Sequence, residues 1–199
     1  MNDFCMAPWT HTYISPQGER RLCCASREPA QNFKQYIDTE QGTGEFTPLT
    51  LEQWWNSEHV RTVRSKWLSG QVPDTCEVCD KKLLNTNVYK DYFGHLFGNL
   101  RQQAIDSTDA LGYTTMEPIS FDYRFSNLCN FKCRMCGEQL SSTWETEKKV
   151  HNMWTPENQP FMVPEIKSAM QDFQQNVVEP EFRDAVSRGI VEEMYWVGG

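Results

Sequence analysis

The segment ISFDYRFSNLCNFKCRMCGEQ, residues 119–139, decides the fold class, because a strand pattern runs directly into a cluster of cysteines. Residues 119–125 alternate apolar and polar side chains and are rich in residues that favour β-structure, so they predict a strand. Cys129, Cys133 and Cys136 follow with the spacing C-x3-C-x2-C, which lets one loop wrap three thiolates around a single metal centre. The segment therefore predicts a metal-binding loop after a strand.

The number of cysteines in this loop indicates the kind of centre. Structural zinc takes four protein ligands and keeps no open position. The loop has three cysteines, and His151, fifteen residues beyond Cys136, falls in a different predicted element. An iron–sulfur cubane held by three thiolates leaves one iron open to another ligand. Disulfide pairing would leave one cysteine over. Arg124, beside the motif, either balances the charge of a cluster or is an exposed arginine at the end of the strand.

The chain on the C-terminal side of this loop predicts a βαβ unit. Residues 138–151 have a helical pattern, and the sequences around Pro164 and Pro180 resemble helix starts, with acidic residues in the first turn. Residues 190–197 form another strand pattern. We expect the two strands to be parallel and adjacent.

The N-terminal part predicts a hairpin followed by helices. Residues 10–15, a Pro-Gln-Gly turn and residues 19–24 form the hairpin, which brings Cys23 back near Cys5. Thr50 and Gln53 form a capping-box pattern that opens one amphipathic helix ending before Gly70. Residues 81–100 are mostly helical in pattern, with an aromatic face assigned to the core.

Five further cysteines lie in this N-terminal part, and they predict a second site. Four of them can close around one metal, and zinc and an iron–sulfur cluster satisfy the thiolates equally well. The four histidines show no mutual spacing that indicates a shared metal and receive no role. The five cysteines are Cys5, Cys23, Cys24, Cys76 and Cys79, and the histidines are His11, His59, His95 and His151.

Composition excludes several classes of protein. The 199 residues have a mean hydropathy of -0.65 and contain no apolar run near the roughly 18 residues of a membrane span. The first residues lack the pattern of a secretion signal, so we expect a cytoplasmic protein. A net charge of -8 opposes general attraction to nucleic acid. Clustered cysteines in a reducing compartment indicate metal binding or catalysis.

The chain is predicted to contain two domains of an α/β protein. Residues 102–118 collect Asp, Ser, Thr, Gly and Pro, so they are interpreted as a linker, with a boundary near Gly112. Residues 1–101 would form an α+β cysteine-rich domain. Residues 119–199 would form the start of an α/β domain.

The sequence from Arg124 to Cys133, together with the C-x3-C-x2-C spacing, closely resembles the first strand and loop of radical S-adenosylmethionine (SAM) enzymes. The resemblance implies that Cys129, Cys133 and Cys136 hold a 4Fe-4S cluster whose free iron chelates SAM. It also implies an incomplete (β/α)6 barrel over residues 119–199. Met135 would replace an aromatic residue near the adenine, and Gly198 and Gly199 would lie along the methionine moiety.

The N-terminal cysteines, with Gly18, Trp54-Trp55-Asn56-Ser57 and one C-x2-C pair, resemble the twitch or SPASM auxiliary cluster domain. The resemblance implies a second 4Fe-4S cluster on Cys5, Cys23, Cys76 and Cys79. Cys24 is surplus and is interpreted as a substitute for Cys23 or as a buried thiol. The single pair fits the one-cluster twitch form.

Together these resemblances imply a radical SAM enzyme, or a fragment or half of one. It would cleave SAM reductively to a 5'-deoxyadenosyl radical and modify a substrate, with a peptide or protein implied by the auxiliary domain. The implied partners are that substrate and a reductant such as flavodoxin or ferredoxin. The alternative is a non-catalytic iron–sulfur or zinc protein that carries electrons or binds partners.

Overall fold

The computed structural model describes residues 4–16, 18–26, 48–82, 88–134, 136–138, 140–153 and 167–195, without the side chains of residues 80–82 and 167. Within these ranges, no helix is both long and apolar enough to cross a membrane. The elements are, in chain order, α1 (Ala7–Thr10), β1 (His11–Ile14), β2 (Arg20–Arg21), α3 (Leu51–Trp55), α4 (Glu58–Leu68), η1 (Asp74–Cys76), α5 (Glu77–Lys82), α6 (Val88–Phe97), η2 (Gly98–Leu100), α7 (Arg101–Asp106), β3 (Ser120–Tyr123), α8 (Ser142–Val150), α9 (Lys167–Phe173), η4 (Gln174–Val178), α10 (Glu179–Ser187) and β4 (Glu193–Met194).

One mixed sheet with strand order β2-β1-β3-β4 organises this α/β fold. β1 and β2 pair antiparallel, which confirms the predicted hairpin, and β4 lies parallel to β3, which confirms the predicted βαβ unit. The parallel pairing of β1 with β3 is new, and it matches Tyr13 with Asp122 across more than a hundred residues of chain. The sheet therefore joins strands from both predicted domains.

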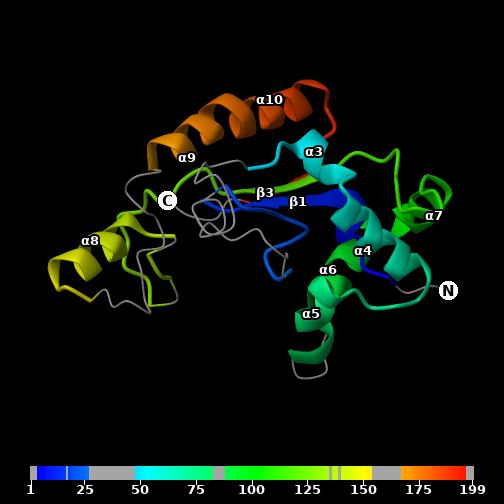
Figure 1. Ribbon diagram of the computed structural model, residues 1–199, viewed down its shortest axis with the longest axis horizontal. Coiled ribbons are helices and arrows are strands. Elements are labelled where there is room, and N and C mark those ends of the chain that lie inside the picture. The colour runs from blue at the N-terminus through cyan, green and yellow to red at the C-terminus, as the bar shows by residue number, and fades with distance from the viewer. Residues whose placement is uncertain are drawn as a thin grey trace.

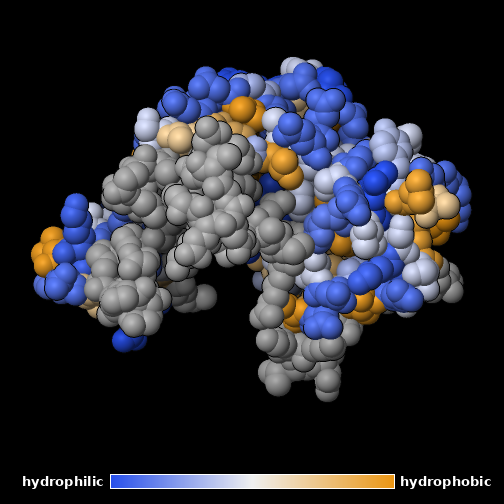
Figure 2. Space-filling view, in the orientation of Figure 1, coloured by the Kyte–Doolittle hydropathy of each residue, from blue (hydrophilic) through white to orange (hydrophobic). Residues whose placement is uncertain are grey.

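Alternation along β3 gives the sheet two chemically different faces. Phe121 and Tyr123 point to one face, where both rings pack against Phe182 of α10. Figure 1 shows α9 and α10 lying along this face of β1 and β3. The outer side of these helices is mainly hydrophilic in Figure 2, as expected for amphipathic helices over a sheet. Ser120 and Asp122 point to the other face, which is polar and also buried.

A second core lies beside the amino end of β1. Trp9 is fully buried and contacts Phe4, with 4.8 Å between the ring centroids. Helices α4 and α6 add the other large side chains of this core. The buried aromatic and aliphatic residues contributed by these two helices are Val60, Val63, Trp67, Phe93 and Phe97.

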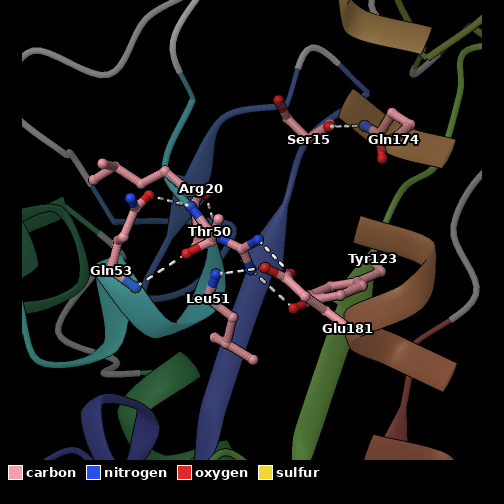
Figure 3. A network of polar contacts seen from close by, with 9 residues as sticks. Ser15, Arg20, Thr50, Leu51, Gln53, Tyr123, Gln174 and Glu181 are labelled. Carbon is pink, nitrogen blue, oxygen red and sulfur yellow. Dashed lines mark hydrogen bonds and ion pairs between the residues drawn. The ribbon is translucent and has the colours of Figure 1, made fainter. Parts of the chain in front are cut away.

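A buried ion pair connects the hairpin to α10, as Figure 3 shows. The Arg20 guanidinium, 1% exposed, donates to Glu181 at 2.6 Å and to the Tyr123 hydroxyl at 2.8 Å. The other Glu181 oxygen accepts from the backbone N–H of Leu51 at 2.6 Å, at the start of α3. Both charged groups form hydrogen bonds to groups on other elements, so this network ties the hairpin, α3, β3 and α10 together.

The single helix predicted from Thr50 is wrong, because Asn56 and Ser57 divide it into α3 and α4. The predicted capping box at Thr50 and Gln53 is present. Asn56 ends the first helix, and its side chain accepts from Arg64 at 2.8 Å and from the Thr114 backbone at 3.1 Å. Ser57 then caps α4. Contacts distant in sequence thus override the continuous helical pattern.

Other predicted elements are present with shorter bounds. β3, α8 and β4 lie within the predicted ranges, whereas residues 81–100 contain the end of α5, all of α6 and η2. Glu179 does begin α10, but α9 and the π-helical turn η4 lead into it without a break. The predicted helix start around Pro164 lies outside the described residues.

Residues 102–118 pack against the N-terminal helices. Residues 101–106 form α7, and Thr114 and Met116 are buried. Gly112 has a φ of +80°, and a Cβ at this position would lie 2.0 Å from the backbone oxygen of Arg61. Only glycine fits this contact. The division into two domains around this segment stays a prediction.

Candidate metal centres

Four of the five N-terminal cysteines line one cavity. Cys5 precedes α1, Cys23 follows β2, and Cys76 and Cys79 lie at the junction of η1 and α5. The hairpin returns Cys23 to the amino end of β1, as predicted, while the turn from η1 into α5 presents the C-x2-C pair. Three separate segments of chain thus bring four thiols to a common space.

The surroundings of these thiols are mostly apolar. Ala7, Pro8, Leu22 and Trp67 line the cavity beside the cysteines, and no carboxylate occurs among the described lining residues. Burial raises the pKa of the Cys5 thiol to about 12. Burial, and then the neighbouring Cys5 and Cys24, raise the pKa of the Cys23 thiol. Both thiols are therefore protonated at neutral pH, and a metal centre would have to displace their protons.

Cys24 differs from these four cysteines. It is exposed, it is not among the residues that line the cavity, and its thiol forms a hydrogen bond with Tyr89. The pKa of Cys24 is raised, mainly by partial burial of the thiol. The exposure of Cys24 contradicts the predicted buried thiol, and its substitution for Cys23 stays a prediction.

The metal-ligating side chains of the described residues are not arranged to hold a single metal ion. Four sulfurs around one zinc ion lie about 3.8 Å apart, since each Zn–S bond is about 2.3 Å. Among the residues that the structure describes, no three Cys, His, Asp or Glu side chains have an arrangement that could hold one metal ion. The cavity gathers four thiols without that tight grouping.

The C-terminal cysteines lie on a loop at the carboxyl end of β3. Cys133 is exposed, and Cys129 and Cys136 are half-buried. Cys136 donates its backbone N–H to the Cys133 carbonyl at 3.0 Å, which closes a tight turn. The buried Asn127 side chain donates to the Glu138 carbonyl at 3.1 Å and so ties the two ends of the loop together.

Hydroxyl groups at the start of α8 hold this loop. The Cys129 carbonyl accepts from Ser142 at 3.2 Å and from Thr143 at 3.0 Å, while Ser141 donates to the Phe131 carbonyl at 2.8 Å. Ser141 also caps α8. These residues were not predicted as part of the site, although a run of three hydroxyl residues near the start of the helical pattern is the available sequence signal.

The side chains around the loop face outward. Leu128 is 66% exposed and Phe131 is 65% exposed. No residue of α8 is buried. Ion pairs of Lys132 with Glu147, and of Lys148 with Glu138 at 2.7 Å, fasten the loop to this helix. The loop is therefore held by polar contacts and remains open to solvent.

The two cysteine sites lie at opposite ends of the sheet. The cavity is at the amino end of β1, and the loop leaves the carboxyl end of β3, which is parallel to β1. In Figure 1, α8 lies beyond one end of these strands and α4 to α6 lie at the other. The strands themselves span about 10 Å between these ends.

Several predicted residues are placed differently or lie outside the described chain. Met135, Gly198 and Gly199 are outside the described residues. Arg124 is not an exposed strand-end residue, because its side chain is 13% exposed and bound to Asp122. His11 is buried, and one of its ring nitrogens lies 2.7 Å from the Ser120 hydroxyl.

Residues 5–80 match the family model described as SPASM, an iron-sulfur cluster-binding domain. The match begins at Cys5 and includes the C-x2-C pair, so it spans all four cysteines that line the cavity. No curated protein and no solved structure matches the chain. The chain is thus similar to an iron–sulfur domain over its N-terminal part.

The donor set of the cavity fits such a cluster. Soft thiolates select zinc, copper(I) and iron–sulfur clusters, and four cysteines are the usual ligand set of a 4Fe-4S centre. The loop offers three thiols only, so a cluster bound there would keep an open iron position. The cavity therefore offers four thiols, and the loop offers three.

Proposed function

We propose that this protein is a radical SAM enzyme, or part of one, with two 4Fe-4S clusters. Cys5, Cys23, Cys76 and Cys79 would hold an auxiliary cluster. The three cysteines of the loop would hold the cluster that binds SAM. One observation carries this proposal: a three-thiol loop lies at the carboxyl end of a parallel strand, in a chain whose SPASM-like segment also forms a four-thiol cavity.

The auxiliary assignment rests on the cavity and on the family match. Three segments of chain converge there, and the aromatic core around Trp9 and Trp67 fixes their backbones. Cys5 is buried and Cys23, Cys76 and Cys79 are partly buried, so four thiols gathered in a mostly apolar cavity suit a centre that keeps all its protein ligands.

The assignment of the SAM site rests on the solvent exposure of the three-cysteine loop and on its position at the carboxyl end of β3. Ligands of parallel sheets bind at the carboxyl ends of the strands, where this loop lies. When bound, the cluster and SAM would supply one-electron reductive cleavage of a carbon–sulfur bond. The chain's own part is to hold three thiolates in one loop through the hydroxyls of Ser141, Ser142 and Thr143. By resemblance, Met135 would contact the adenine, and Gly198 and Gly199 the methionine moiety.

The proposed partners follow from the exposure of the loop. Exposed Cys133, with Leu128 and Phe131 beside it, would allow close approach by a small reductant such as flavodoxin or ferredoxin. The proposed substrate is a peptide or protein, by analogy with enzymes that contain an auxiliary cluster domain.

The test is anaerobic reconstitution with iron and sulfide, followed by EPR of the reduced protein with and without SAM. We expect SAM to change the spectrum of the wild type and to leave unchanged that of a triple variant, Cys129→Ala, Cys133→Ala and Cys136→Ala. Cys24→Ser is the matched control, because this cysteine lies outside the described cavity lining. It should behave as the wild type does.

A wild-type EPR spectrum that does not change when SAM is added would reject the SAM site. If zinc alone were bound as well, a non-catalytic metal protein would replace the enzyme as the better account.

A further inference from the structure

The loop with the three cysteines starts from a fixed point on the sheet. The regular pairing of β1 with β3 ends at Ile14 and Tyr123. Arg124 continues it, because its backbone N–H donates to the Ile14 carbonyl at 3.0 Å. The direction in which the chain leaves the sheet toward Cys129 is therefore set at Arg124.

The Arg124 side chain folds back along its own strand. Its Nε and Nη2 atoms donate to the two carboxylate oxygens of Asp122, each at 2.9 Å. The side chains of Arg124 and Asp122 are only 13% and 6% exposed. A two-pronged contact of this kind needs the planar guanidinium, and a lysine cannot reproduce it.

Tyr13 links this pair to the hairpin. The Arg124 guanidinium lies over the Tyr13 ring, 4.8 Å from its centroid, and Arg21 lies 6.0 Å from the same centroid. Tyr13 is the register partner of both Arg21 and Asp122. One row of side chains thus crosses β2, β1 and β3 on the face opposite α10.

The two ends of this row are close in sequence to the two cysteine sites. At one end, Arg21 is two residues before Cys23, and it pairs with buried Glu19 at 2.6 Å. At the other end, Arg124 is five residues before Cys129. Two guanidinium groups face two carboxylates, so the row is balanced in charge. Its members contact one another, and none of the contacts described here reaches a loop cysteine.

We infer that Arg124 is a positioning residue, which fixes the three-cysteine loop relative to the sheet through Asp122 and Tyr13. The inference rests on the proposed function, since it concerns how the loop presents its cluster. Loss of a group that hydrogen-bonds directly to a metal ligand typically costs about 10- to 100-fold in metal affinity or activity. Arg124 contacts no loop cysteine, so we expect an effect at the low end of this range, about 10-fold.

The test compares Arg124→Met with Arg124→Lys in the reconstituted protein. Arg124→Met removes the charge and both donors, whereas Arg124→Lys keeps the charge and loses the two-pronged contact. Arg183→Met is the matched control, because Arg183 is an exposed arginine on α10 in an ion pair with Glu179. The readouts are the EPR spectrum of each cluster, the SAM concentration for half-maximal spectral change, and the thermal midpoint.

Arg124→Met should raise that SAM concentration about 10-fold and broaden the signal of the loop cluster, while the auxiliary signal stays as in the wild type. For Arg124→Lys, the SAM concentration for half-maximal change and the width of the loop signal should lie between those of the wild type and Arg124→Met. Arg183→Met should match the wild type. An unchanged loop signal in Arg124→Met, or equal loss of both clusters in Arg124→Met and Arg124→Lys, would overturn the positioning role.

Failure of the proposed function has a different signature. If SAM changes no spectrum in the wild type, the SAM site is wrong, and the loop signal of the reduced variants without SAM still decides the role of Arg124. If the wild type assembles no cluster on the loop, both proposals are rejected. If Arg124→Met does not fold, Arg124→Lys against the wild type gives the deciding comparison.

Discussion

The two cysteine regions differ in how the protein encloses them. The N-terminal thiols lie in a cavity whose walls belong to an aromatic core, and three chain segments converge on it. The C-terminal thiols lie on one short loop that hydroxyl groups and ion pairs hold against an exposed helix. A closed set of ligands suits a centre that keeps its coordination, and an open set suits one that binds a further ligand. The difference in enclosure supports the two roles that we propose for the two cysteine sites.

The largest expected effect comes from breaking the buried ion pair between the N-terminal hairpin and α10. Arg20→Met leaves the Glu181 carboxylate without its buried partner, which typically costs about 3–5 kcal/mol. Because one sheet joins strands that lead to both regions, we expect a single urea-unfolding transition at lower urea concentration. Arg183→Met, which removes an exposed ion pair of α10, is the control and should change the midpoint little. Two separate transitions would show that the regions fold independently.

The polar face of the sheet predicts a loss of stability in acid. Burial lowers the pKa of His11 to about 3, from an ordinary value of 6.5. As the pH falls below 6.5, the unfolded chain binds a proton that folded His11 does not, so the free energy of unfolding falls by at most about 1.4 kcal/mol per pH unit. This loss continues until the pH approaches 3.

Urea midpoints measured between pH 7 and pH 4 check this expectation. His11→Gln should flatten the pH dependence, whereas His151→Gln, at an exposed position beside the other cysteine region, should keep it. Equal slopes for the wild type and His11→Gln would disprove the account of this face.

A smaller loss of stability should be confined to α8 and the three-cysteine loop. Ser141→Ala removes the cap of α8 and the hydrogen bond to the Phe131 carbonyl, at a cost of about 1 kcal/mol. Hydrogen exchange should increase in α8 and in the cysteine loop and stay unchanged around the cavity. Thr62→Ala, which removes an exposed hydroxyl that bonds a carbonyl within α4, is the control. Increased exchange around the cavity would mean that the loop is not a separate local unit.

Much of the local structure could be predicted, because its signals are local. The hairpin, the capping box at Thr50 and the strand before the cysteine loop depend on residues close in sequence. The parallel pairing of β1 with β3 has no such signal, since its register depends on contacts between residues about 110 positions apart. The same limit explains the break at Asn56, whose partners Arg64 and Thr114 come from later segments.

The candidate sites follow the same division. The resemblance to the auxiliary cluster domain singled out the four cysteines that line the cavity, whereas spacing alone could not place Cys24 outside the lining. Nor could it show that Arg124 turns back onto Asp122, because a strand-end arginine is exposed in most contexts. Side-chain direction depends on tertiary partners that the motif does not contain.

Iron counting on matched cysteine variants tests the central claim most directly. The wild type should bind about eight irons per chain after anaerobic reconstitution, as two 4Fe-4S clusters. Replacing Cys129, Cys133 and Cys136 with alanine should leave about four, and replacing Cys5, Cys23, Cys76 and Cys79 should also leave about four. SAM should change the EPR spectrum only where the loop cysteines remain. If either set of substitutions removed all the iron from a folded protein, or neither removed any, the account of two separate sites would be contradicted.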